Sequence, residues 1–181
     1  MSEEGFEQKY VKEAFDTNWV VPMGPNVNAF EQNLADFANA NLDGSKLDRK
    51  VVCLSAGTAA VHLALIACGV KAGDEVCVQS VTFCASSHPI TYLGAKPVFI
   101  DSERETWNMD PELLEKAIVE RKAVTGKYPK AIIPVALYGM PYDCERIMAI
   151  ADKYGIPVIE DAAEGMGSRF NGQVLGTFGR F

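Results

Sequence analysis

Short apolar runs rich in Val and Ile alternate along this chain with segments of helical periodicity, and this alternation restricts the fold more than any other feature. It is typical of βαβ units, in which helices cover both faces of a parallel sheet. The pattern predicts an α/β protein with three layers, α/β/α, around a mostly parallel sheet. The expected core strands are residues 50–54, 75–80, 97–101, 130–136 and 157–160. The expected helices are residues 58–68, 84–93, 111–120 and 144–154.

Two local signals mark where elements begin and turn. Asp110 precedes Pro111, and aspartate is a preferred N-cap while proline is favoured at the first helical position, so Asp110 is expected to cap the helix that follows. Further along, Asn171-Gly172 lies between short strand-like pieces and predicts a β-hairpin.

The segments ahead of the sheet form a separate group. Residues 4–15 and 27–40 carry apolar side chains at helical spacing, and the prolines in 22–25 require a non-helical link between them. We expect residues 1–45 to form an N-terminal arm with helices, and residues 46–181 to be the N-terminal part of a larger domain. A parallel sheet normally needs further elements to cover its last strand, so the chain is expected to be truncated.

Composition excludes several classes of function. The chain has 181 residues, of which 48% are hydrophobic, which is enough for one domain with a real core. Its net charge of −7 argues against a nucleic-acid-binding surface. No apolar stretch is long enough to span a membrane and the acidic N-terminus is unlike a signal peptide, so we expect a cytoplasmic protein. The two histidines and five cysteines lack the spacing of metal ligands, so no metal site is expected.

Asp161 is the clearest candidate for a site residue. It follows the apolar run 157–160, and parallel sheets bind ligands beyond the carboxyl ends of their strands. A carboxylate in such a place needs a cationic partner, yet the nearest basic residue downstream is Arg169. We interpret the partner as a ligand. The alternative is that Asp161 caps the next turn.

Two other strand ends carry complementary chemistry. Gly57 and Thr58, in Ser55–Ala60, follow an expected strand and open an apolar helix, where free N–H groups and the helix dipole favour a phosphate. The alternative is an ordinary turn with Ser55 or Thr58 as N-cap. Phe83 offers a ring that could stack on a planar ligand, or could belong to the core. With Asp161, these groups match the phosphate, ring and ring nitrogen of pyridoxal 5′-phosphate.

Five motifs follow one another along the chain: Ser55–Leu65, Gly73–Val76, Thr82-Phe83, Gly94–Phe99 and Glu160–Glu164. In this order they resemble the motifs of a known family, the DegT/DnrJ/EryC1/StrS aminotransferases. These are fold-type I pyridoxal-phosphate enzymes that act mostly on nucleotide-linked keto sugars. The resemblance implies that Gly57 and Thr58 hold the phosphate, Phe83 stacks on the pyridine ring and Asp161 pairs with the ring nitrogen. It places Glu164 near the cofactor's phenolic oxygen, unless that side chain turns away.

One departure from the family limits what this chain is expected to do alone. The family carries its Schiff-base lysine beyond the hairpin, and residues 162–181 contain no lysine. The resemblance therefore implies a lysine beyond Phe181, no catalytic residue here, and an inactive chain without that segment. For the full-length protein it implies a homodimer that moves an amino group, with glutamate as the expected donor, to a nucleotide-linked keto sugar. The alternatives are a sugar dehydratase with histidine in place of the lysine, a non-catalytic cofactor-binding or structural module, and a plain nucleotide-binding domain.

Overall fold

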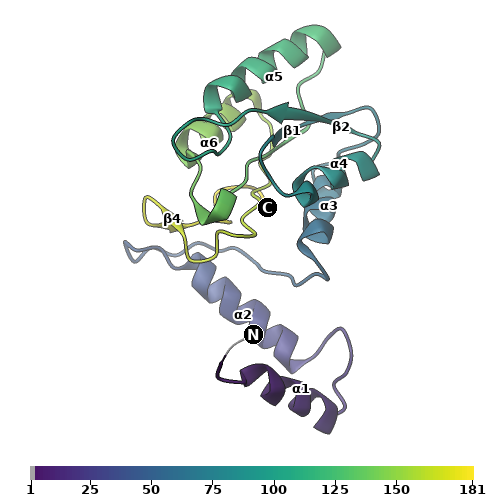
Figure 1. The fold of residues 1–181 in the computed structure, drawn as a ribbon, viewed down its shortest axis with the longest axis vertical. Helices are drawn as coiled ribbons and strands as arrows, with labels where there is room; N and C mark the ends of the chain where they lie inside the picture. Colours follow the sequence, from purple (N-terminus) through teal and green to yellow (C-terminus); the bar gives the residue numbers. More distant parts are fainter. Residues whose placement is uncertain (1–2) are drawn as a thin grey trace.

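Three parallel strands form the centre of the computed structural model, which describes residues 3–181 (Figure 1). They are β1 (Glu75–Gln79), β2 (Lys96–Ile100) and β3 (Ala131–Ile133), in the order β2-β1-β3. Isolated parallel bridges from Ile132 to Val158 and from Val135 to Asp161 add a fourth position beside β3. Asp161 therefore lies at the carboxyl end of the sheet.

The side chains of β1 alternate between two cores, as expected for a sheet covered on both faces. Val76 and Val78 pack in one core with buried residues of α3 (Gly57–Ala67) and α4 (His88–Tyr92). Cys77 packs in the other core with residues of α5 (Pro111–Thr125) and α6 (Cys144–Tyr154). The fold therefore has three layers, which confirms the predicted α/β/α class.

The start of α5 confirms the predicted cap. The Asp110 carboxylate accepts hydrogen bonds from the backbone N–H groups of Glu112 and Leu113, at 2.7 and 3.2 Å. At the other end, Gly126 adopts the left-handed conformation with φ 75° that terminates helices.

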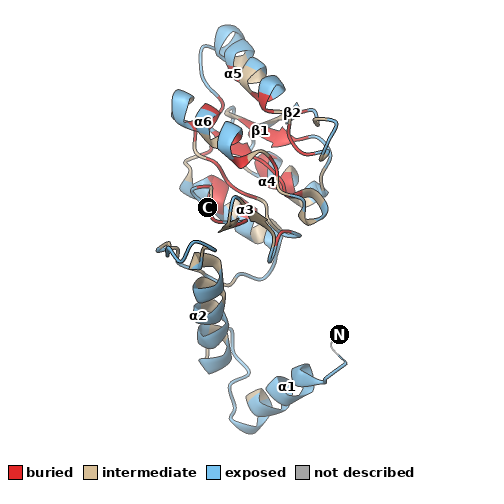
Figure 2. Cartoon of the chain, turned by 90° about the vertical axis from the view of Figure 1, so that its left-hand side faces the viewer, coloured by how far each residue is buried: buried red, intermediate tan, exposed pale blue. Residues whose placement is uncertain are grey.

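The two N-terminal helices lie away from the sheet. In α1 (Phe6–Asp16) and α2 (Pro25–Asn39) no residue is buried, and Figure 2 shows both helices in the colours of exposed and intermediate residues. The loop after α2 is tied to the hairpin of β4 (Arg169–Phe170) and β5 (Gln173–Val174), because Leu42 N–H donates to the Gly172 carbonyl at 3.1 Å. The hairpin itself was correctly predicted, and Asn171 and Gly172 both have positive φ, as a type I′ turn requires.

Three sequence predictions need correction. Residues 50–54 form no strand, because the Cys53 N–H donates to the Glu31 carboxylate of α2 at 2.7 Å rather than to a neighbouring strand. Residues 157–160 pair with the β3 segment only through isolated bridges, since Pro157 and, on the β3 side, Pro134 have no N–H to donate. The predicted helix 84–93 is divided into η1 (Cys84–Ser86) and α4, which starts anew with Pro89 in its first turn.

Over residues 3–181, no helix combines the length and apolarity that a bilayer crossing needs. In the same range, no three histidine, cysteine or acidic side chains gather as metal ligands would.

Replacing Asp110 by Ala is expected to lower the free energy of unfolding by about 1 kcal/mol, because two N–H groups of α5 lose their acceptor. Asp110→Asn keeps an acceptor oxygen and should cost only a few tenths of that. Chemical denaturation of the two variants measures the difference, and equal losses would contradict the capping role.

Candidate functional site

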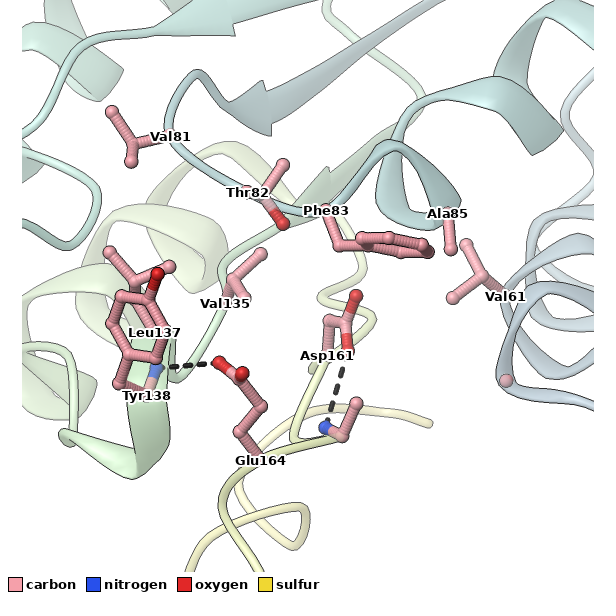
Figure 3. A pocket seen from close by; sticks show the side chains of 12 residues that line it. Val61, Val81, Thr82, Phe83, Ala85, Val135, Leu137, Tyr138, Asp161 and Glu164 are labelled. Carbon is pink, nitrogen blue, oxygen red and sulfur yellow. Dashed lines mark hydrogen bonds between the residues drawn. The ribbon is translucent and has the colours of Figure 1, made fainter.

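The order of the strands creates a crevice at one edge of the sheet. The chain passes from β1 to β2 on one side and then returns to place β3 on the other side of β1. Ligands in open α/β sheets bind at such a reversal, beyond the carboxyl ends of the strands. A cavity of about 450 Å³ lies there, within the usual size range of ligand sites (Figure 3). Its lining residues are Gly57, Val61, Val81, Thr82, Phe83, Ala85, Val135, Leu137, Tyr138, Asp161, Ala163 and Glu164.

Four of the five cofactor-binding residues predicted from the sequence line this one cavity: Gly57, Phe83, Asp161 and Glu164. Thr58 is not among the lining residues, although it follows Gly57 in the first turn of α3. Phe83 is 78% exposed and its ring faces the cavity in Figure 3, so it does not belong to the core. The structure thus brings together groups from three separate junctions of the chain.

The N-terminus of α3 opens onto the cavity without a side-chain cap. Its N-cap is Ala56, so neither Ser55 nor Thr58 caps the helix as the alternative interpretation required. The first N–H groups of a helix have no partner within it, and with the dipole they favour an anion. A Cβ added at Gly57 would meet no atom within 4 Å, so the space beside Gly57 at this helix end is open.

Asp161 is held in place by groups that carry no charge. Ser86 Oγ donates to Asp161 Oδ2 at 2.6 Å, and the Ala163 N–H donates to Oδ1 at 3.3 Å. Ser86 is fully buried, and its hydroxyl also lies 2.8 Å from Thr82 Oγ1. Within residues 3–181 no ion pair involves Asp161, so no cation of that part of the chain neutralises the half-buried carboxylate.

Sequence reasoning missed Ser86 and Tyr138. Ser86 lies inside a predicted helix beside a second serine, and nothing in the sequence links it to Asp161, which is 75 positions away. Tyr138 follows the end of β3, in η2 (Leu137–Gly139), and is 88% exposed at the cavity. Its N–H donates to Glu164 Oε2 at 2.6 Å. The signal that could have found Tyr138 is its place just after a predicted strand.

Glu160, which precedes Asp161, is a buried carboxylate that anchors the last residues of the chain. It accepts hydrogen bonds from the N–H groups of Gly176, Phe178 and Gly179, at 2.7, 3.0 and 3.4 Å. Burial raises the pKa of the Glu160 carboxyl above its ordinary value of 4.5, although these N–H groups oppose the shift. Its oxygens are committed to the backbone, so Glu160 serves the frame of the site.

Comparison with known proteins identifies the family of the chain. The sequence model of the DegT/DnrJ/EryC1/StrS aminotransferase family matches residues 1–181. The chain belongs to this family.

Its relatives include the Bacillus subtilis (strain 168) protein EpsN, named provisionally as a pyridoxal phosphate-dependent aminotransferase, which is 49% identical and covers 98% of this chain. The UDP-2-acetamido-2-deoxy-3-oxo-D-glucuronate aminotransferase of Pseudomonas aeruginosa PAO1 is 44% identical over 83% of this chain. Among solved structures, NtdA from Bacillus subtilis with its bound cofactor PMP matches with a TM-score of 0.78 and 31% identity over 92% of this chain. The chain spans only 43%, 38% and 35% of the length of these three proteins.

Replacing Ser86 by Ala is expected to lower the free energy of unfolding by about 1–3 kcal/mol, because a carboxylate loses a buried donor. The matched control is Ser87→Ala, since the Ser87 hydroxyl only reaches the Cys84 carbonyl at 3.3 Å. Chemical denaturation should show the larger loss for Ser86→Ala. Equal losses would show that the Ser86–Asp161 bond adds nothing to stability.

The raised pKa of the Glu160 carboxyl predicts that the stability of the fold depends on pH. Because its folded-state pKa is raised, folded protein takes up a proton at Glu160 before unfolded protein does, so this group adds stability as pH falls toward 4.5. The stability of the wild type relative to Glu160→Gln should therefore increase as pH falls from 7 to 4.5. Denaturation curves at both pH values test this, and a relative stability that stays constant or decreases would contradict it.

Proposed function

We propose that the intact protein is a pyridoxal phosphate-dependent aminotransferase that moves an amino group from glutamate to a keto sugar linked to a nucleoside diphosphate. One observation carries the proposal: the uncapped start of α3, the exposed ring of Phe83 and the carboxylate of Asp161 meet at one cavity. Family membership and the names of the relatives support the reaction and the substrate class.

The residues at the cavity fit this cofactor. The first N–H groups of α3, at Gly57 and Thr58, would hold the phosphate in the open space before the helix. The ring of Phe83 would stack on the flat pyridine ring. Asp161, which lacks a cationic partner within residues 3–181, would pair with the protonated ring nitrogen. Glu164, which the resemblance places near the phenolic oxygen, already accepts from the Tyr138 N–H.

The role of each of these residues follows from its chemistry. When bound, pyridoxal phosphate supplies an electron-withdrawing ring that stabilises negative charge on the carbon beside the transferred amino group. Asp161 would keep the proton on the ring nitrogen and so maintain that withdrawal. Ser86 and the Ala163 N–H orient the carboxylate. The apolar side chains of Val61, Ala85 and Val135 line the cavity and would reduce access of water to a bound ring.

A further group is needed for catalysis. Transamination requires an amine that holds the cofactor covalently and moves a proton between donor and acceptor carbons. We propose that this lysine lies in the part of the relatives that the present chain does not span, beyond Phe181. The chain by itself is then inactive.

The remaining features of the proposal concern the whole protein. The division into an arm, residues 1–45, and a cofactor-binding part, residues 46–181, is supported by the absence of buried residues in α1 and α2. The homodimer is supported by exposed aromatic side chains on these helices, among them Phe6, Phe15 and Phe30. The cytoplasmic location rests on composition, and glutamate as donor rests on the family resemblance.

Replacing Asp161 by Asn is expected to weaken pyridoxal phosphate binding about tenfold or more, because the ring nitrogen loses its countercharge. The matched control is Asp152→Asn, an exposed residue of α6, which should bind as the wild type does. The measurement is an absorbance titration of pyridoxal phosphate into protein expressed from its complete gene. Adding L-glutamate should then convert the spectrum of the wild type to that of the aminated cofactor.

Binding that is equally strong in both aspartate variants would refute the assignment of Asp161. A wild-type spectrum that glutamate leaves unchanged would contradict transamination from this donor and favour the dehydratase.

A further inference from the structure

The cavity has a second end that the proposed cofactor contacts leave unused. In Figure 3, Phe83, Ala85 and Val61 lie on one side, and Leu137 and Tyr138 lie on the opposite side. Asp161 and Glu164 lie between the two groups. A ligand with its ring on Phe83 and Asp161 would leave the side of Tyr138 open to a second molecule.

The backbone of Tyr138 adopts an unfavourable conformation, and packing of its side chain does not compensate for it. Its backbone has φ 51° and ψ 28°, in the left-handed region that is unfavourable for a residue with a side chain. The side chain is 88% exposed, so it contributes little to either core. Strained residues persist where the surrounding structure holds them, and they are concentrated at binding sites.

The buried side-chain amide of Asn108 holds the turn that carries Tyr138. Asn108 Oδ1 accepts from the Leu137 N–H, and Asn108 Nδ2 donates to the Met140 carbonyl, both at 3.0 Å. Asn108 is only 1% exposed, and it lies 3.4 Å from Nε2 of the fully buried Gln79. One side chain thus bridges both ends of the turn, and buried polar groups of this kind are retained only where they are satisfied.

The Glu164 carboxylate holds the same turn through a further hydrogen bond. Its Oε2 accepts from the Tyr138 N–H at 2.6 Å, which is a charge-assisted bond to the strained residue itself. The next residue, Gly139, has φ 79°, and a Cβ there would lie 2.8 Å from the Glu164 carbonyl. The turn therefore lies directly against the Glu164 backbone. Glu164 constrains both the Tyr138 amide and the position of the turn.

We propose that Tyr138 forms the wall of the acceptor site, where its ring packs against the apolar C–H face of the keto sugar. Asn108 and Glu164 are positioning residues that hold the ring there. A rigid aromatic side chain suits this task, because it offers a large apolar face with few rotatable bonds and a hydroxyl for a polar contact. The identity of the sugar as acceptor rests on the proposed function. The role assigned to Glu164 is to hold the turn.

The ring is tested with two variants of Tyr138 in the protein expressed from its complete gene. Tyr138→Asn removes the ring with a residue that tolerates the left-handed backbone, and Tyr138→Phe keeps the ring. The acceptor probe is UDP-2-acetamido-2-deoxy-3-oxo-D-glucuronate, after the Pseudomonas aeruginosa relative. The probe for the reverse direction is GDP-perosamine, after the GDP-perosamine synthase of Escherichia coli O157:H7, which is 39% identical over 97% of this chain. With the probe that reacts faster, Tyr138→Asn should raise KM about tenfold, while Tyr138→Phe should stay within about threefold of the wild type. Pyridoxal phosphate affinity should be unchanged in both variants.

The positioning role is tested with Glu164→Ala and its conservative partner Glu164→Gln, which keeps an acceptor oxygen. Hydrogen exchange of the Tyr138 amide, measured without cofactor, should be at least about tenfold faster in Glu164→Ala and largely restored in Glu164→Gln. The KM for the probe should follow the same order.

An unchanged KM in Tyr138→Asn would overturn the assignment of Tyr138. A loss of pyridoxal phosphate affinity in Glu164→Ala as large as that in Asp161→Asn, with the Tyr138 amide still protected, would assign Glu164 to the cofactor instead. The proposed function fails separately, through loss of the glutamate-dependent spectral change in the wild type.

Discussion

The parallel pairing of β2, β1 and β3 is the constraint on which the site depends. Because all three strands point the same way, the segments that follow them emerge at one edge of the sheet. The reversal of strand order at β1 then separates the segments after β1 and β3, which leaves room for a ligand between them. Phe83 and Tyr138 come from these two segments, and Asp161 comes from the bridged position beside β3.

The short segment from Glu160 to Glu164 connects this edge to the rest of the molecule through three carboxylates. Glu160 holds the backbone of residues 176–179, Asp161 is held by Ser86, and Glu164 holds the Tyr138 N–H. Asp161 and Glu164 also line the cavity. A substitution in this segment is therefore expected to disturb stability and ligand binding together, and separate readouts are needed to tell them apart.

Much of the fold could be predicted from the sequence, because the spacing of apolar residues indicates which side chains are buried. The strand at Glu75–Gln79 and the cap at Asp110 both follow from local patterns of residue type. The prediction of a strand at Lys50–Leu54 was wrong. An apolar run favours a strand, but a strand forms only where a neighbouring strand accepts its hydrogen bonds. Here the Cys53 N–H donates to the Glu31 carboxylate instead. The contacts of Ser86 and Glu164 are long-range, so no local pattern could indicate them.

The central claim is that three chain junctions converge on one flat, phosphate-bearing cofactor. A crystal structure of the intact protein with pyridoxal phosphate tests it most directly. The account predicts the ring nitrogen within about 2.7–3.2 Å of an Asp161 carboxylate oxygen, the ring against Phe83, and the phosphate at the first N–H groups of α3. A cofactor whose ring nitrogen contacts another group, or whose phosphate lies away from Gly57, would contradict it.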